Sequence, residues 1–331
     1  MTGPLARIAW LIGGAPLLVA GCSQGLSDDD PTAPDADHGH LPEFPDAEGP
    51  GGGNGDSDAF VDEQGTYVLI TEVMAQPFNN VGNNRAEYIE LWNPTAISFD
   101  LSNYYIATSQ SYATLPAGET DLDFQQDFIV RFPEGTQIDP QDVVVVAIDG
   151  EGFEEAYGEP PNYAIREAGD VSEMRHIEVA NLDQIGISGS GEAVVLFHWD
   201  GESNLVQDVD MMISGIREGV DHPNNVLDKS GIEVDGPATG VALYREDAAT
   251  MALVENQFES RADPGHSYTR LAFPGNAIIK EDGNGITGHD VTSEVLRETW
   301  ESFAEGDEYS PPSPWDLPAS LVDEGARSGG E

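Results

Sequence analysis

Basic residues and cysteine are both scarce in this sequence, and each shortage excludes a class of protein. The chain has 13 lysines and arginines against 61 aspartates and glutamates, which gives a net charge of −48 at pH 7. Nucleic-acid binding requires basic patches that neutralise phosphates, and only Lys229 and Lys280 are lysines. We therefore expect no nucleic-acid partner. Because Cys22 is the only cysteine, no disulfide can form within the chain, and the hydrophobic core and its hydrogen bonds must hold the fold.

The sequence also lacks an apolar run long enough to cross a membrane. The run Ile8 to Ala20 spans about 13 residues, whereas a spanning helix needs about 20. Arg7 precedes this run, and Gly21 and Cys22 follow it. A basic start, a short apolar centre and small residues at the end are typical of a secretory signal peptide. We therefore predict that residues 1–21 are a signal peptide.

The end of this segment, Leu18-Val19-Ala20-Gly21-Cys22, resembles the lipobox of bacterial lipoproteins. The resemblance implies that Cys22 becomes the mature N-terminus, carries diacylglycerol on its sulfur, and often has a third, amide-linked chain. One acyl chain binds a membrane only marginally, whereas two or more give a stable anchor. Ser23, rather than Asp, favours the outer membrane of a Gram-negative bacterium by this resemblance, on either its periplasmic or its surface face. An ordinary signal peptide followed by a chance cysteine is the alternative.

Residues 22–65 are predicted to be an acidic, disordered tether. They are rich in Asp, Pro and Gly, as in Asp28 to Pro31 and Gly49 to Gly55, and they contain no Lys or Arg. Such a segment cannot bury enough apolar surface to offset the entropy of ordering. A flexible chain of about 40 residues spans roughly 35 Å. The tether would therefore hold the following domain away from the membrane. Residues 317–331 are predicted to be a disordered C-terminal tail.

Residues 66–316 carry short β-branched and aromatic segments separated by turn residues. The clearest predicted strands are 67–74, 86–92, 143–148 and 193–199, and the roughly alternating pattern of 86–92 predicts a half-buried strand. Many short strands with turns between them predict an all-β sandwich. A helix is expected near 290–303. Further short strands are expected at 102–108, 205–212, 241–244 and 268–271.

Several of these segments, in order, resemble the lamin tail domain, which implies an immunoglobulin-like β-sandwich. The span is about twice the usual length of that domain, with apparent insertions at 109–140, 149–184 and 213–264. Long inserted loops often carry function. The matching segments are Ile70 to Met74, Glu87 to Pro94, Phe99 to Tyr104, Ile138 to Pro140, Gly186 to Leu196, His266 to Arg270, and Ser310 to Pro314, where Pro312 replaces the usual Gly.

Two groups of oxygen-bearing residues are candidate calcium ligands, because calcium prefers carboxylate and carbonyl oxygens. Asp282, Asn284 and Asp290 lie in a glycine-rich segment that lacks the full spacing and terminal Glu of an EF-hand. The alternative there is a plain glycine-rich turn. The second group lies on strands that pair in the predicted sandwich, where structural hydrogen bonding is the alternative. Its members are Glu72, Glu87 and Glu90.

No catalytic motif is present, so we expect a protein that is not an enzyme. Gly186 to Ser190 does not match the nucleophile elbow G-x-S-x-G, and the zinc motif H-E-x-x-H does not occur. The G-x-G-x-x-G from Gly283 to Gly288 lacks the βαβ context of a dinucleotide site. The main hypothesis is a lipid-anchored envelope or surface protein that presents a lamin-tail-like module to a protein or glycan. The alternatives are a calcium-stabilised structural envelope protein and a hydrolase accessory domain with a site in the inserted loops.

Overall fold

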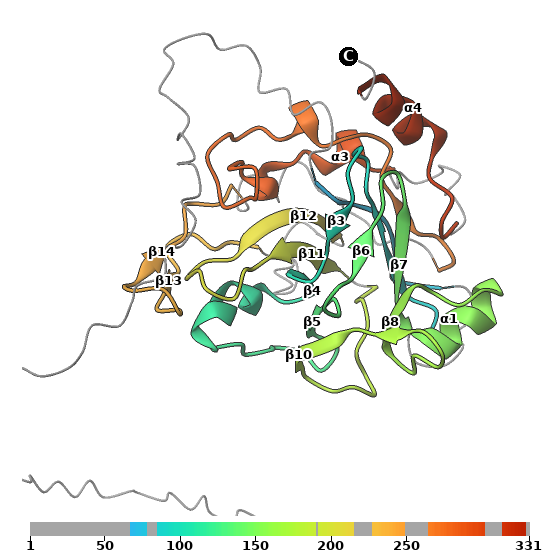
Figure 1. Ribbon diagram of the computed structural model, residues 1–331, viewed down its shortest axis with the longest axis horizontal. Coiled ribbons are helices and arrows are strands. Elements are labelled where there is room, and N and C mark those ends of the chain that lie inside the picture. The colour runs from blue at the N-terminus through green and yellow to red at the C-terminus, as the bar shows by residue number, and fades with distance from the viewer. Residues whose placement is uncertain are drawn as a thin grey trace, which may run out of the picture. The chain divides into compact units, whose positions relative to one another are not determined.

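The computed structural model describes residues 67–77, 85–189, 191–214, 227–248, 264–301 and 313–328, which all belong to one compact unit (Figure 1). The predicted signal peptide, Cys22 and the predicted tether lie outside the described residues. The described part is built mainly of β-strands in two large sheets, so the all-β prediction is confirmed. Among the helices in these ranges, none is long and apolar enough to cross a membrane.

The first sheet has six strands in the order β15-β1-β2-β7-β8-β9. Its central strands pair antiparallel, whereas β7 and β8 run parallel and are joined through helix α1 (Gly150–Tyr157). Asp149 caps α1 by accepting a hydrogen bond from the Gly152 N–H at 2.7 Å, and Gly158 ends the helix in the left-handed conformation. The strands are β1 (Leu69–Met74), β2 (Tyr88–Trp92), β7 (Val143–Asp149), β8 (Tyr163–Arg166), β9 (Ser172–Glu173) and β15 (Tyr268–Thr269).

The second sheet has five strands in the order β10-β5-β4-β11-β12. β11 and β12 form a long antiparallel hairpin whose connection includes Gly201, at a φ of 81°. A two-stranded sheet of β13 (Glu233–Val234) and β14 (Ala242–Leu243) projects beyond this hairpin (Figure 1). The large strands are β4 (Tyr104–Ala107), β5 (Phe128–Arg131), β10 (Arg175–Val179), β11 (Glu192–His198) and β12 (Gln207–Ser214). Short elements are β3 (Phe99–Asp100), β6 (Gln137–Ile138), and the 3-10 helices η1 (Gln110–Ala117) and η3 (Gly275–Ala277).

One hydrophobic core lies between the two large sheets, and a smaller one lies on the outer face of the first sheet. Ile89 of β2 and Leu196 of β11 belong to the main core. Tyr88 belongs to the smaller core, where its ring meets Phe153 of α1 edge to face at 5.5 Å. Both faces of β2 are therefore covered, and all five of its residues are buried. The prediction of a half-buried strand at 86–92 was wrong because α1 covers the face expected to meet solvent.

The C-terminal part of the sandwich also differs from the sequence-based expectation. The helix predicted near 290–303 is two short pieces, η4 (Val291–Ser293) and α3 (Leu296–Thr299). Asp290 caps η4 through the Thr292 N–H, and the backbone is extended again at Glu294. The segment predicted to be a disordered tail contains helix α4 (Ala319–Ser328), because Leu321 is fully buried against the core. Two of the expected insertions supply α1, β5, β8, β9 and β10, so those stretches complete the sheets.

Candidate ligand-binding cleft

A cleft of about 540 Å³ opens where the β11–β12 connection, the β13–β14 hairpin and the glycine-rich loop of residues 282–290 meet. Small-molecule sites in proteins typically occupy about 300–1,000 Å³, so the cleft is large enough for a ligand of several rings. Three parts of the chain that lie far apart in sequence supply its walls. The residues that bear on its chemistry are His198, Trp199, Asn204, Gln207, Leu243, Arg245 and Asn284.

The end of β11 provides an aromatic wall. The Trp199 Nε1–H donates a hydrogen bond to the Ser203 carbonyl oxygen at 2.9 Å, which fixes the indole ring at the turn. The Trp199 ring lies tilted against Tyr105, with centroids 6.4 Å apart. His198 packs edge-on against Tyr104, and burial lowers the pKa of its imidazole, so this side chain is neutral at pH 7. The wall is therefore aromatic, with the exposed carboxylate of Asp200 at its end.

The β13–β14 hairpin provides an aliphatic wall. Leu243 lies in the cleft lining and is 57% exposed. The hairpin is held to the β11–β12 connection by Asn204, whose Nδ2 donates to the Gly240 carbonyl oxygen. Leu243 and Trp199 therefore line the same cleft from two different segments of the chain.

The glycine-rich loop that carries the first group of candidate calcium ligands forms the third wall. The Asn284 side chain pairs with the Arg245 backbone, accepting from its N–H and donating to its carbonyl oxygen, both at 2.9 Å. Asn284 Nδ2 also donates to Asp247 Oδ1 at 2.6 Å. Gly283 packs so closely that a Cβ there would lie 2.3 Å from the Cα of Asp290. Glycine is therefore required by close backbone contact within the loop.

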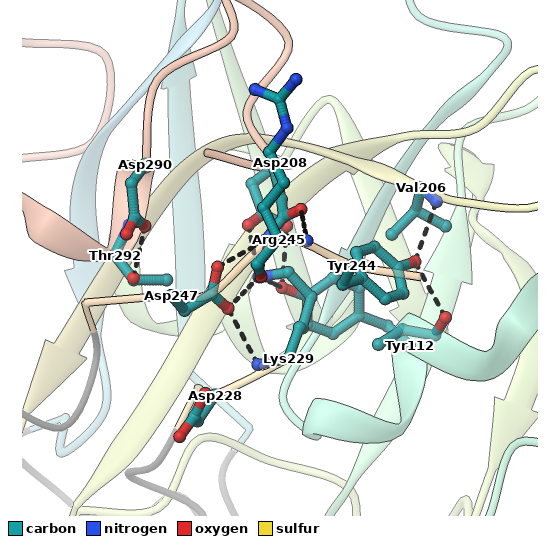
Figure 2. A network of polar contacts seen from close by, with 12 residues as sticks. Tyr112, Val206, Asp208, Asp228, Lys229, Tyr244, Arg245, Asp247, Asp290 and Thr292 are labelled. Carbon is teal, nitrogen blue, oxygen red and sulfur yellow. Dashed lines mark hydrogen bonds and ion pairs between the residues drawn. The ribbon is translucent and has the colours of Figure 1, made fainter. Parts of the chain in front are cut away.

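A buried ionic network lies beneath this wall (Figure 2). Lys229 Nζ donates to Asp208 Oδ2 at 2.6 Å and to Asp247 Oδ2 at 2.7 Å, and its side chain is fully buried. The Tyr112 hydroxyl donates to the other oxygen of Asp208 at 2.8 Å. Burial raises the pKa of Asp208 even though Lys229 opposes this. Burial alone would lower the pKa of Lys229, but the two facing carboxylates more than offset it and raise that pKa.

The calcium candidates of the glycine-rich loop are all occupied by protein partners. Asp282 forms an exposed ion pair with Arg245. Asp290 Oδ1 accepts from the Thr292 N–H at 3.1 Å, and its Oδ2 lies 3.2 Å from Lys280 Nζ. The Asn284 side chain is hydrogen-bonded to the Arg245 backbone N–H and carbonyl oxygen. These side chains therefore shape the loop.

The second group of calcium candidates is divided between two places. Glu72 and Glu90 face each other on β1 and β2. Their carboxylates receive the backbone N–H groups of Ser313, at 3.2 Å, and Trp315, at 2.6 Å. Glu87 is separate, and its Oε2 accepts from the Ile187 N–H at 2.7 Å. Across the described ranges, no three His, Cys, Asp or Glu side chains are grouped so that they could hold a metal ion.

Sequence reasoning missed the network formed by Lys229, Asp208 and Asp247. One signal was available, because Lys229 is one of only two lysines in a strongly acidic chain. Another was the two aspartates, Asp208 and Asp210, in the largely apolar strand β12. A β-bulge between them gives them separate partners, Lys229 and Arg270. Neither signal identifies the partners, since these come from distant segments.

Comparison with known proteins adds little to this geometry. No family model and no curated protein matches the chain. Among solved structures, a DUF4876 family protein from Bacteroides thetaiotaomicron is similar at 14% sequence identity, over 77% of this chain and 75% of that one, with a TM-score of 0.38.

Proposed function

We propose that this chain is an exported, lipid-anchored protein of the cell envelope whose lamin-tail-like, immunoglobulin-like sandwich binds an uncharged glycan in the cleft. The proposed ligand follows from the cleft lining, where Trp199 and Leu243 line the same cleft as the amide side chains of Asn204 and Gln207. Anchoring through Cys22 and the acidic tether rests on the lipobox resemblance and on composition.

The chemistry of the lining favours sugars. A pyranose ring presents C–H groups that pack on the electron-rich face of an aromatic ring, and hydroxyls that exchange hydrogen bonds with amides. The charged side chains in the lining, Asp200 and Arg245, are of opposite sign, and burial lowers the pKa of His198, which favours its neutral form. A net charge of −48 repels polyanions, so an uncharged glycan fits the molecule better than an acidic one.

Binding is tested on the full chain in detergent with an array of neutral glycans, followed by calorimetry on any that bind. Trp199→Ala is expected to weaken binding about thirty-fold, because a central tryptophan is typically worth 2 kcal/mol or more. Leu243→Ala is expected to weaken it about ten-fold. Ile97→Ala is the matched control, since Ile97 is 64% exposed and lies outside the cleft lining. Equal affinity in all three variants, or no bound glycan, contradicts the proposal.

The anchor is tested separately by labelling cells that express the chain with a radioactive fatty acid. The wild-type chain is expected to carry label and to fractionate with membranes, whereas Cys22→Ala is expected to lose both properties. Label retained by Cys22→Ala would contradict lipidation at this cysteine.

A further inference from the structure

Lys229 is an unusual residue to bury in this protein. Its side chain has no solvent exposure, and those of Asp208 and Asp247 are 4% and 0% exposed. Within the described ranges, the other fully buried cation is Arg270, which pairs with Asp210 and Glu294. An arginine serves a purely structural ion pair well, but its guanidinium is never deprotonated in a protein. A lysine amine becomes a nucleophile once it loses one proton.

The geometry places this amine against an electrophilic carbon. Nζ lies 2.6 Å from Asp208 Oδ2, and a carboxyl C–O bond is about 1.2 Å long, so Cγ is at most about 3.8 Å away. The Tyr112 hydroxyl donates to Asp208 Oδ1 at 2.8 Å (Figure 2). That hydroxyl is positioned to stabilise negative charge on Oδ1 if nitrogen adds to Cγ, as an oxyanion-hole donor does.

The two aspartates have different surroundings, which divides their roles. Asp247 accepts from Lys229 Nζ, from the Lys229 backbone N–H at 2.9 Å and from Asn284 Nδ2 at 2.6 Å. Its two oxygens are therefore surrounded by three N–H donors. Among the residues that the structure describes, only Lys229 and Tyr112 donate to the Asp208 carboxyl, and burial raises its pKa. Asp208 is therefore the carboxyl better suited to be the neutral acid, which is the form an amine attacks.

We propose that Lys229 Nζ and Asp208 Cγ become joined by an intramolecular isopeptide bond in the folded protein, with Asp247 carrying the protons. Asp247 takes one proton from the ammonium, and the free amine pair then forms the N–C bond as electrons move onto Oδ1. Through Asp247, a second nitrogen proton reaches the Asp208 hydroxyl. The C–O bond breaks and releases one water. The products are the amide, water and a protonated Asp247, so no oxidant or cofactor is needed.

The reaction has to occur only once in each molecule, so a small population of neutral amine is sufficient. Its product ties β12 to the segment that begins at Leu227, directly beneath the cleft. Cys22 is the only cysteine and is assigned to the lipid, so disulfides cannot stabilise this exported chain. An amide cross-link lowers the conformational entropy of the unfolded chain in the same way as a disulfide.

The bond is tested by digesting the purified full chain with trypsin and measuring peptide masses. Trypsin cuts after Arg175, Arg217, Arg245 and Arg261, and after Lys229 only when its amine is free. We expect residues 176–217 joined to 218–245, with a mass one water below their sum. An uncut linear peptide 176–245 has the same mass, so fragmentation of the joined product must show two N-termini, at His176 and at Glu218. Complete cleavage after Lys229, with peptide masses equal to those of the sequence, overturns the proposal. A joined product whose fragmentation shows N-termini at Glu218 and Glu246 would place the bond on Asp247 and overturn the assignment to Asp208.

The proton-carrying role is tested with variants whose folding is checked by circular dichroism. Asp247→Ala is expected to fold without the cross-linked peptide, and Tyr112→Phe to form it more slowly after refolding. Lys280→Met is the matched control, because Lys280 is the other lysine and is partly exposed, and it should be cross-linked as fully as wild type. If Asp247→Ala does not fold, time courses of Tyr112→Phe decide whether the oxyanion contact matters. Full cross-linking in Asp247→Ala would overturn the role of Asp247.

Discussion

Glu90 should make the stability of this protein fall as pH rises. Its carboxylate lies on β2, accepts hydrogen bonds from Thr71 Oγ1 at 2.7 Å and the Trp315 N–H at 2.6 Å, and faces Glu72 across the strand pair. Burial, followed by repulsion from Glu72, raises the pKa of Glu90 from 4.5 to about 7. The folded state therefore holds this proton more tightly than the unfolded chain does.

The sign and size of the effect follow from proton linkage. Below pH 4.5 the group is protonated in both states, and its contribution to stability is fully present. Between pH 4.5 and about 7 the unfolded chain releases the proton first, so the free energy of unfolding falls. A pKa raised from 4.5 to about 7 corresponds to a loss of about 3 kcal/mol across that window.

Glu90→Gln removes the titration while keeping an oxygen for the Trp315 N–H. Urea unfolding of the full chain at several pH values from about 5 to about 8 gives the free energy at each. Relative to wild type, the variant should gain about 3 kcal/mol as pH rises through the window. Glu178→Gln is the control, because Glu178 is an exposed carboxylate on β10, and its curve should parallel wild type. Parallel curves for Glu90→Gln and wild type would refute the reasoning.

Two further predictions concern the buried ion pairs and the wall of the cleft. Arg270→Met leaves Asp210 and Glu294 buried without their cation, so urea unfolding should show a loss of about 3–5 kcal/mol. Arg245→Met, which breaks an exposed ion pair, should lose no more than about 1 kcal/mol, and equal losses would contradict the argument. Gly283→Ala should lower the melting temperature and weaken ligand binding together, since its Cβ would lie 2.3 Å from the Cα of Asp290. Gly240→Ala has a positive φ but no atom within 4 Å, so it should lose only about 1 kcal/mol, and a larger loss there than at Gly283 would refute the packing argument.

The sequence by itself determined the all-β class and most strand positions. Strand patterning and turn chemistry are local. A strand such as Val143 to Ile148 can therefore be predicted without knowing which strands pair with it. The cover on the outer face of β2 was not predictable in this way. It depends on Phe153 of α1 and on Trp315, which lie far from β2 in sequence.

The functional chemistry was decided by tertiary structure. Glu72, Glu87 and Glu90 were predicted to lie together on paired strands. The hydrogen bonds that Glu72 and Glu90 accept from the Ser313 and Trp315 N–H groups join positions more than 200 residues apart. Tyr112, Asp208 and Lys229 likewise meet across separations of 96 and 21 residues. A residue's type and its near neighbours set its local conformation. The pKa of a buried carboxyl, and the atoms that a buried amine contacts, depend on groups from distant parts of the sequence. Only folding brings those groups together.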